Sequence, residues 1–258
     1  MFEKIIEIYK TIEKTDIGNN NLQPTFLYNE GWMLKLVLKW FFENKGNSYY
    51  LSMEKDSKWF SEALLSSKFL KEFRGDKLAE SYTHADGVYG DFIIGENGIG
   101  DLYLKNNCKE FVVVEAKLFS RFSEGITNAS NYNQAARNIA CMCNIVVNSK
   151  QNPDKISFYA IIPNIQITEE PTFNKYLKID HIKQTVLNRV TQYLNRENYM
   201  EKKQWYIDHF LPFCDKINVK LLSWEEIIEY IHKSDSKYGE ELMKFYEYCI
   251  MYNRSIKK

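Results

Sequence analysis

Residues 111–118 have the sequence Phe-Val-Val-Val-Glu-Ala-Lys-Leu, which is the part of the chain most informative about its fold. The apolar residues at its start predict a strand that is buried on both faces and is therefore central in a sheet. Glu115 and Lys117 follow at the end of the strand. Side chains two positions apart on a strand share a face, so this carboxylate and this ammonium are expected to project together.

Two shorter strands are expected before this central strand, over 88–94 and 100–104, with a turn at Gly95–Gly98 between them. Asp101 opens the second of these strands. A short turn of the chain then leads directly into the central strand. We therefore expect a three-stranded meander in which Asp101 and Glu115 converge on one point.

Asp86 and Asp91 compete with Asp101 for this position. Asp91 lies across the first expected turn from Asp101, and Asp86 follows His84, a residue type that is more often hydrogen-bonded within a fold than functional. An Asp before a strand is often only a turn former, and a Glu-x-Lys pair at a strand end is often only solvated. Asp101 is favoured because its strand is directly joined to the strand of Glu115.

Two carboxylates and one ammonium at the edge of a buried sheet predict a metal site. Two neighbouring carboxylates without a cation repel each other, which disfavours their charged forms. Mg²⁺ suits one or two carboxylates together with a substrate phosphate, and Mn²⁺ can replace it. Such a metal ion polarises a phosphoryl oxygen and acidifies a bound water, and Lys117 can orient that water or stabilise developing charge. The expected chemistry is hydrolysis of a phosphodiester bond.

The remaining patterns predict helices around this sheet. The order of the elements indicates an α/β fold in which a mixed central sheet is flanked by helices on both faces. No internal repeat or linker divides the chain, so one domain over 1–258 is expected. Apolar spacing predicts helices over 2–14, 26–44, 57–72, 131–147, 224–232 and 237–250, helical pieces over 171–210, and further strands over 156–162 and 219–223.

Asp101 together with Phe111–Lys117 resembles the core motif of the PD-(D/E)xK nuclease superfamily. The resemblance implies a restriction-endonuclease-like αβββαβ core over about 26–162, with added N- and C-terminal helices and an extension over about 163–258. It also implies that the Asp and the Glu bind Mg²⁺ and that Lys117 assists catalysis. The family often has Pro before its Asp, and Gly100 stands there in this chain.

The resemblance extends to two flanking helices. Many members carry a Glu on the helix before the sheet, and Glu30 is the match, as a catalytic residue and a third metal ligand. A Glu in the first turn of a helix is also favoured by the helix dipole alone. Many members carry a Gln on the helix after the Glu-x-Lys strand, and Gln134 is the match. Arg137 and Asn138 share its helix face.

The function that the resemblance implies is a Mg²⁺-dependent nuclease, an endonuclease-type hydrolase acting on DNA rather than RNA, in a defence or repair setting. Two alternatives stay open: a catalytically inactive nucleic-acid-binding module of the same fold, and a plain interaction protein. The net charge of zero weakens a claim of broad nucleic-acid affinity. Residues 171–205 nevertheless hold seven Lys or Arg against three acids, interleaved with tyrosines, which suits a nucleic-acid backbone as well as a solvated helix face.

Composition and end signals predict a cytoplasmic protein. Hydrophobic residues make up 45% of the 258 residues, which allows a sizeable core. The five cysteines are odd in number and irregularly spaced, as free thiols in a reducing compartment are. The charged N-terminus does not resemble a signal peptide, and no apolar run approaches the roughly 20 residues of a membrane span. A homodimer or a partner protein is left open.

Overall fold

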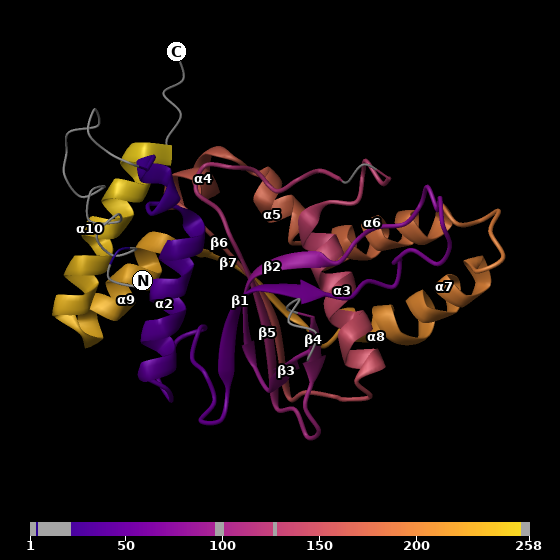
Figure 1. The fold of residues 1–258 in the computed structure, drawn as a ribbon, viewed down its shortest axis with the longest axis horizontal. Coiled ribbons are helices and arrows are strands. Elements are labelled where there is room, and N and C mark those ends of the chain that lie inside the picture. The colour runs from indigo at the N-terminus through magenta and orange to yellow at the C-terminus, as the bar shows by residue number, and fades with distance from the viewer. Residues whose placement is uncertain (1–3, 5–21, 96–100, 126–127, 254–258) are drawn as a thin grey trace, which may run out of the picture.

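The computed structural model describes residues 4, 22–95, 101–125 and 128–253. It has α/β architecture, with a mixed five-stranded sheet flanked by helices (Figure 1). The elements follow in the order η2 (Pro24–Phe26), α2 (Glu30–Glu43), β1 (Lys58–Leu65), β2 (Thr83–Gly90), β3 (Phe92–Ile94), β4 (Leu102–Leu104), β5 (Glu110–Ala116), α3 (Gln134–Asn148), β6 (Lys155–Ile162), α4 (Asn164–Glu169), α5 (Thr172–Tyr176), α6 (Ile179–Thr191), α7 (Tyr199–Trp205), η3 (Tyr206–Phe210), α8 (Leu211–Cys214), β7 (Asn218–Ser223), α9 (Trp224–Ser234) and α10 (Ser236–Asn253).

The main sheet has the strand order β1-β2-β5-β6-β7. β1 and β2 pair antiparallel, β2 and β5 pair antiparallel, and β5, β6 and β7 run parallel to one another. Every residue of β5 is buried, as the apolar run of Phe111–Val114 predicts for a central strand. The second strand of the parallel part, β6, is also almost entirely buried. The chemistry-bearing end of β5 therefore lies in the middle of the sheet.

The prediction of a helix over 57–72 is wrong, because Lys58–Leu65 forms the edge strand β1. Its apolar residues fit a strand as well as a helix, and pairing with β2 decides between them. The register of this pairing passes over Glu62, whose φ is 59°. A residue other than glycine in this left-handed region marks a local distortion of the strand.

The predicted three-stranded meander is also wrong. β3 and β4 pair with each other, but they form a separate two-stranded sheet, and β5 pairs with β2. The turn predicted at Gly95–Gly98 lies, apart from Gly95, outside the described residues. The chain leaves β2 at Gly90, where φ is 132° and an added Cβ would lie 2.0 Å from the carbonyl oxygen of Glu110. The carboxylate of Asp91 then accepts the backbone N–H groups of Lys109 and Glu110, at 2.9 and 3.2 Å. These contacts return the chain to β2 after the hairpin.

Two apolar clusters lie on the two faces of the sheet. One lies between the sheet and α3, α6, η3 and α8, and the other lies between the sheet and α2, α9 and α10. Figure 1 shows these two groups of helices on opposite sides of the strands. The C-terminal stretch thus supplies β7 to the sheet and packs α10 against α2, so that it completes one of the two layers.

The other predicted elements are confirmed within a few residues. α2, α3, β6, β7, α9 and α10 lie where the sequence places them, and 171–210 is helical in several pieces. Ser223 and Glu226 form a capping box at the start of α9. The helix expected over 2–14 lies, apart from Lys4, outside the described residues. Within the described part of the chain, no helix is both long enough and apolar enough to cross a membrane.

Candidate active site

The Glu115 carboxylate is fully buried and is bound by three side chains. The ammonium of Lys117 and the amide of Gln134 both donate to Oε1. The amide of Asn138 donates to Oε2, with 3.0 Å between nitrogen and oxygen. Glu115 has an exposed fraction of 0%. A carboxylate held in this way has its orientation fixed from two sides, by its own strand and by α3.

Asp86 is the second carboxylate of the site. It lies on β2 next to Gly87, which pairs with Val114 of β5. Asp86 is therefore directly opposite Glu115 on the neighbouring antiparallel strand. Its Oδ2 accepts the backbone N–H of Ala116 at 2.8 Å and lies 4.0 Å from the Lys117 ammonium. Its side chain keeps an exposed fraction of 23%. Asp86 is therefore the carboxylate of the pair that solvent can reach.

The electrostatics of the pair follow from burial. Desolvation, together with the charge of Asp86, raises the pKa of Glu115 to about 8 against the opposing effect of Lys117. Burial lowers the pKa of Lys117, but the charges of Glu115 and Asp86 outweigh it and raise that pKa above its ordinary value. The ammonium of Lys117 is thus held in its charged form. The carboxylate of Glu115 binds a proton at a higher pH than an exposed glutamate does.

The N-terminus of α3 carries the amides to Glu115. Asn133 caps the helix by accepting the backbone N–H of Ala136 at 3.0 Å. Gln134 is the first helical residue, and its backbone N–H donates to the carbonyl of Ser123 at 3.0 Å. Asn138 follows Gln134 by four positions and therefore shares its helix face.

The backbone of Lys117 is fixed by the neighbouring strand and by α9. Its N–H donates to the carbonyl of Ile161 at 2.9 Å. Its carbonyl accepts the indole N–H of Trp224 at 3.0 Å. The lysine is therefore positioned by β6 and by the first residue of α9, and only its side chain is free to respond to a ligand.

Glu30, the first residue of α2, lies near this group. Its charge contributes to the raised pKa of Lys117, although less than the charges of Glu115 and Asp86. Glu30 is half-buried and has no ion pair among the described residues. The structure thus brings Glu30 to the neighbourhood of the site without placing it in contact.

Asp101 does not join the site in the way that the sequence predicts. The expected hairpin between its strand and the strand of Glu115 does not form, because β4 pairs with β3. Asp101 is bridged to Leu64 of β1, its carbonyl accepts the N–H of Gly95 at 2.7 Å, and its carboxylate raises the pKa of Tyr103 through a hydrogen bond.

The other candidates lie outside the group around Glu115. Asp91 binds the backbone after β4, as described above. His84 is exposed, with its Nδ1 4.0 Å from a carboxylate oxygen of Glu62. Arg137 lies toward a different group, because its charge opposes the raised pKa values of Glu80 and Tyr132.

The oxygen atoms of the site fit a hard divalent cation held by two carboxylates. Glu115 Oε2 accepts one hydrogen bond, Asp86 Oδ1 accepts none from the described residues, and the buried Oδ1 of Asn138 has no partner in the described part of the chain. No group of three or more His, Cys, Asp or Glu residues among those described is close enough to hold a metal ion. Glu115 and Asp86 would therefore be the protein ligands, and Mg²⁺ commonly completes such a set with water and substrate phosphate.

The comparisons with known proteins give no relatives. No protein-family model, no curated protein and no solved structure matches this chain.

Two members of the site differ from the sequence prediction. Asp86, which the sequence offered only as a competitor of Asp101, lies opposite Glu115, and Gly87 beside it allows α2 to approach closely. A Cβ on Gly87 would lie 2.8 Å from Leu38. Asn138 was visible only as a neighbour of Gln134 on one helix face, and its direct contact with Glu115 needs the packing of α3 onto the sheet.

Proposed function

We propose that this protein is a Mg²⁺-dependent nuclease, with DNA favoured over RNA by the resemblance described above. The observation that carries the proposal is the fully buried Glu115 carboxylate, held by Lys117 and two amides, with Asp86 across the sheet. A buried carboxylate with a raised pKa beside a second carboxylate is typical of a functional site.

The order of the elements supports the same proposal. α2, β1, β2, β5, α3 and β6 give the sequence αβββαβ once the β3–β4 hairpin is set aside as an insertion. This is the order that the PD-(D/E)xK resemblance implies. In this reading Asp86 fills the position of the family's Asp, Glu115 and Lys117 form the Glu-x-Lys pair, and Gln134 lies on the following helix.

Each residue of the site then has a distinct task. A metal ion bound here would polarise a phosphoryl oxygen and lower the pKa of a bound water. Glu115 and Asp86 would hold it, with Gln134 and Asn138 fixing the orientation of Glu115. Lys117, positioned by its backbone contacts, keeps its proton and stabilises the charge that develops on the phosphate.

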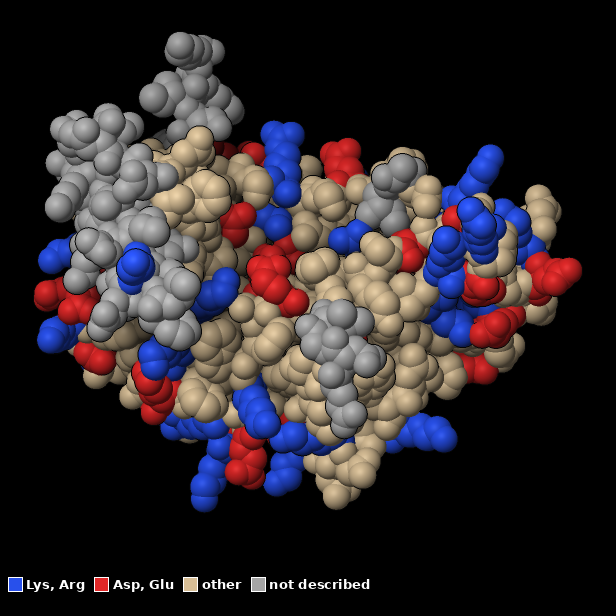
Figure 2. All heavy atoms as spheres, in the orientation of Figure 1, with Lys and Arg blue, Asp and Glu red and all other residues tan. Residues whose placement is uncertain are grey.

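Exposed basic residues at one end of the molecule favour a polyanionic substrate. The stretch 171–205 supplies fewer of them than its sequence predicts, because Arg189 and Lys202 are buried. The loop between β1 and β2 adds three exposed cations, Lys71, Arg74 and Lys77. Figure 2 shows basic side chains, with acids among them, at the end of the molecule formed by α6, α7 and this loop, and acidic side chains near the middle of the face.

An exposed aromatic ring adds a second kind of contact on that loop. Phe73 is 49% exposed, and the guanidinium of Arg196 lies 5.8 Å from its ring centre. Aromatic rings combined with cations bind unpaired bases through stacking and charge. This surface favours a strand with accessible bases.

The direct test combines cleavage with metal binding. The wild-type protein is expected to cleave plasmid or single-stranded DNA in the presence of Mg²⁺ or Mn²⁺ and not in chelator. The melting temperature is expected to rise with the metal, by about 5–10 °C at about 100 times Kd, since such binding stabilises the fold by roughly 2.7 kcal/mol. RNA of the same sequence serves as the comparison substrate. Absence of both cleavage and stabilisation at about 10 mM metal would instead indicate an inactive module.

The stability of the metal-free protein is expected to depend on pH through Glu115. Its pKa is raised in the folded state, so proton binding favours folding. This contribution is complete below the ordinary pKa of 4.5 and is lost as pH rises through about 8. In chelator, the melting temperature should therefore fall by several degrees between about pH 5 and pH 9, and it should fall less in Glu115→Gln. Parallel curves for the two proteins would show that Glu115 is not the responsible group.

A further inference from the structure

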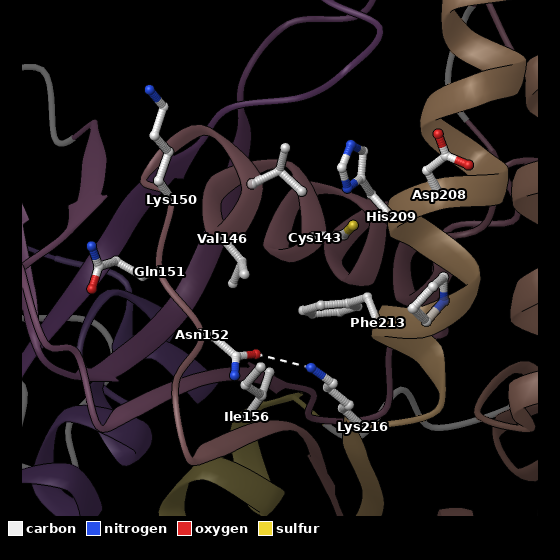
Figure 3. A pocket seen from close by; sticks show the side chains of 12 residues that line it. Cys143, Val146, Lys150, Gln151, Asn152, Ile156, Asp208, His209, Phe213 and Lys216 are labelled. Atoms are coloured by element: carbon white, nitrogen blue, oxygen red, sulfur yellow. Dashed lines mark hydrogen bonds between the residues drawn. The ribbon is translucent and has the colours of Figure 1, made fainter.

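A pocket lies at the C-terminal end of α3, away from the group around Glu115. Its volume is about 280 Å³, and the side chains used below are Lys150, Asn152, Asp208, His209, Phe213 and Lys216 (Figure 3). Asn138, which binds Glu115, and Val146, which lines the pocket, are eight residues apart on α3. At 1.5 Å per residue this is about 12 Å along the helix axis. The two sites share a helix but no side chain.

Lys150 occupies a backbone position that glycine normally takes. Its φ is 52°, and it ends α3 as the left-handed residue of a Schellman motif. Its N–H donates to the carbonyl of Val147 at 3.0 Å, and the N–H of Gln151 donates to the carbonyl of Val146 at 3.2 Å. A side chain at such a position strains the backbone. Because strained positions cluster at functional sites, a lysine at this position beside a pocket makes the pocket a candidate binding site.

A π-helical turn forms the opposite wall. η3 spans Tyr206–Phe210 and places Asp208 and His209 beside the pocket. Single π turns are rare and are frequent at functional sites. The amide of Gln204 donates to Asp208 Oδ2 at 2.6 Å, which holds that carboxylate in place. This wall therefore places an exposed carboxylate and an imidazole at the rim of the pocket.

The mouth and the floor differ in chemistry. Figure 3 shows Lys150 and Lys216 on opposite sides of the pocket, with the Phe213 ring pointing between them. Lys216 Nζ donates to Asn152 Oδ1 at 3.0 Å, so this ammonium is held at the mouth. Phe213 is buried and forms an apolar floor together with Ile156. The pocket thus combines two cations, an acceptor and an aromatic surface.

We infer that this pocket binds a nucleoside monophosphate. The phosphate would lie at Lys216 and Asn152 with Lys150 reaching over it, the base would pack on Phe213, and the hydroxyl or amino groups of the nucleoside would donate to Asp208. The volume of about 280 Å³ lies just below the range of about 300–1,000 Å³ that is usual for small-molecule pockets, which suits a ligand no larger than a mononucleotide and excludes a duplex. The inference does not depend on the proposed nuclease function.

The test measures binding of the four ribonucleoside monophosphates by isothermal titration calorimetry on the full chain, in chelator so that no metal ion contributes. At least one is expected to bind with a Kd below about 1 mM, and its nucleoside and inorganic phosphate are each expected to bind at least about tenfold more weakly. Absence of saturable binding for all four at about 5 mM overturns the inference.

Two substitutions show where the nucleotide binds. Lys150→Gly should raise the melting temperature by a degree or more, since glycine relieves the strained backbone, and should weaken nucleotide binding at least tenfold. Lys216→Gln should weaken it similarly. Asn107→Gly is the matched control, because Asn107 is exposed with a φ of 58° in the turn after β4. It should keep full binding. Undiminished binding in both lysine variants would place the nucleotide elsewhere and refute the assignment.

Discussion

Replacement of Glu115 by glutamine is expected to abolish Mg²⁺-dependent cleavage of DNA, with a rate loss on the order of 10³-fold or more, the scale seen when a charge-stabilising group is removed from an active site. Glutamine keeps the shape of the side chain and removes one of the two proposed metal ligands. The fold should persist, because Glu115 is a desolvated carboxylate whose pKa is already raised toward neutrality. Initial rates on plasmid DNA, with circular dichroism as the check on folding, measure this effect.

Glu110 provides a matched control on the same strand. It too is fully buried, and its carboxylate binds the Lys155 ammonium and the Ser57 hydroxyl, each at 2.6 Å. Removal of its charge leaves Lys155 without its partner, so Glu110→Gln should lower the melting temperature. Cleavage by the folded fraction should be unchanged. Equal losses of cleavage in the two variants would mean that burial of a charge, rather than its position, explains the result.

The second large effect distinguishes two aspartates. Asp86→Asn is expected to lose cleavage by a similar factor and to lose the rise in melting temperature caused by Mg²⁺, because Asp86 faces Glu115 across the sheet. Asp101→Asn is expected to retain both, since Asp101 lies on the β3–β4 side and contacts Gly95 and Tyr103. Asparagine preserves the shape of aspartate, so packing changes little in either variant.

Measurement of both properties in both variants makes the comparison decisive. Differential scanning fluorimetry with increasing Mg²⁺ reports binding, and cleavage under saturating metal reports chemistry. Loss in Asp101→Asn together with retention in Asp86→Asn would restore the arrangement that the sequence predicts and would contradict the strand pairing of β2 with β5 as the basis of the site.

The contrast between these aspartates shows what local patterns can predict. The apolar run before Glu115 placed β5 correctly at the centre of the sheet, and the resemblance to the PD-(D/E)xK superfamily pointed to Gln134. Consecutive strands usually pair with each other, and this rule led to Asp101. Here the β3–β4 hairpin lies between β2 and β5 in the sequence but outside the main sheet. The contacts of Asp91 with the backbone of Lys109 and Glu110, which accompany this arrangement, cannot be predicted from a periodic pattern.

The burial of charged side chains could not be predicted from the sequence either. Arg189 and Lys202 belong to a stretch that is basic in composition, yet both have exposed fractions of 1%. The guanidinium of Arg189 lies among aromatic rings, and the ammonium of Lys202 binds Glu72 at 2.6 Å. Glu72 is 130 positions away in the chain. Local charge composition cannot predict a partner at that separation, so only the folded structure shows which cations remain for a ligand.

The hydrogen bond from Trp224 to the carbonyl of Lys117 has a consequence for the order of events during protein synthesis. Glu115 and Lys117 leave the ribosome more than a hundred residues before Trp224 does, and chains are made from the N-terminus. Until then β6 lacks its neighbour β7, and α2 lacks the cover of α10. A nascent chain that stalls or is released before β7 therefore carries the charged pair without the support that fixes it, and the site becomes complete only when the last quarter of the chain has folded.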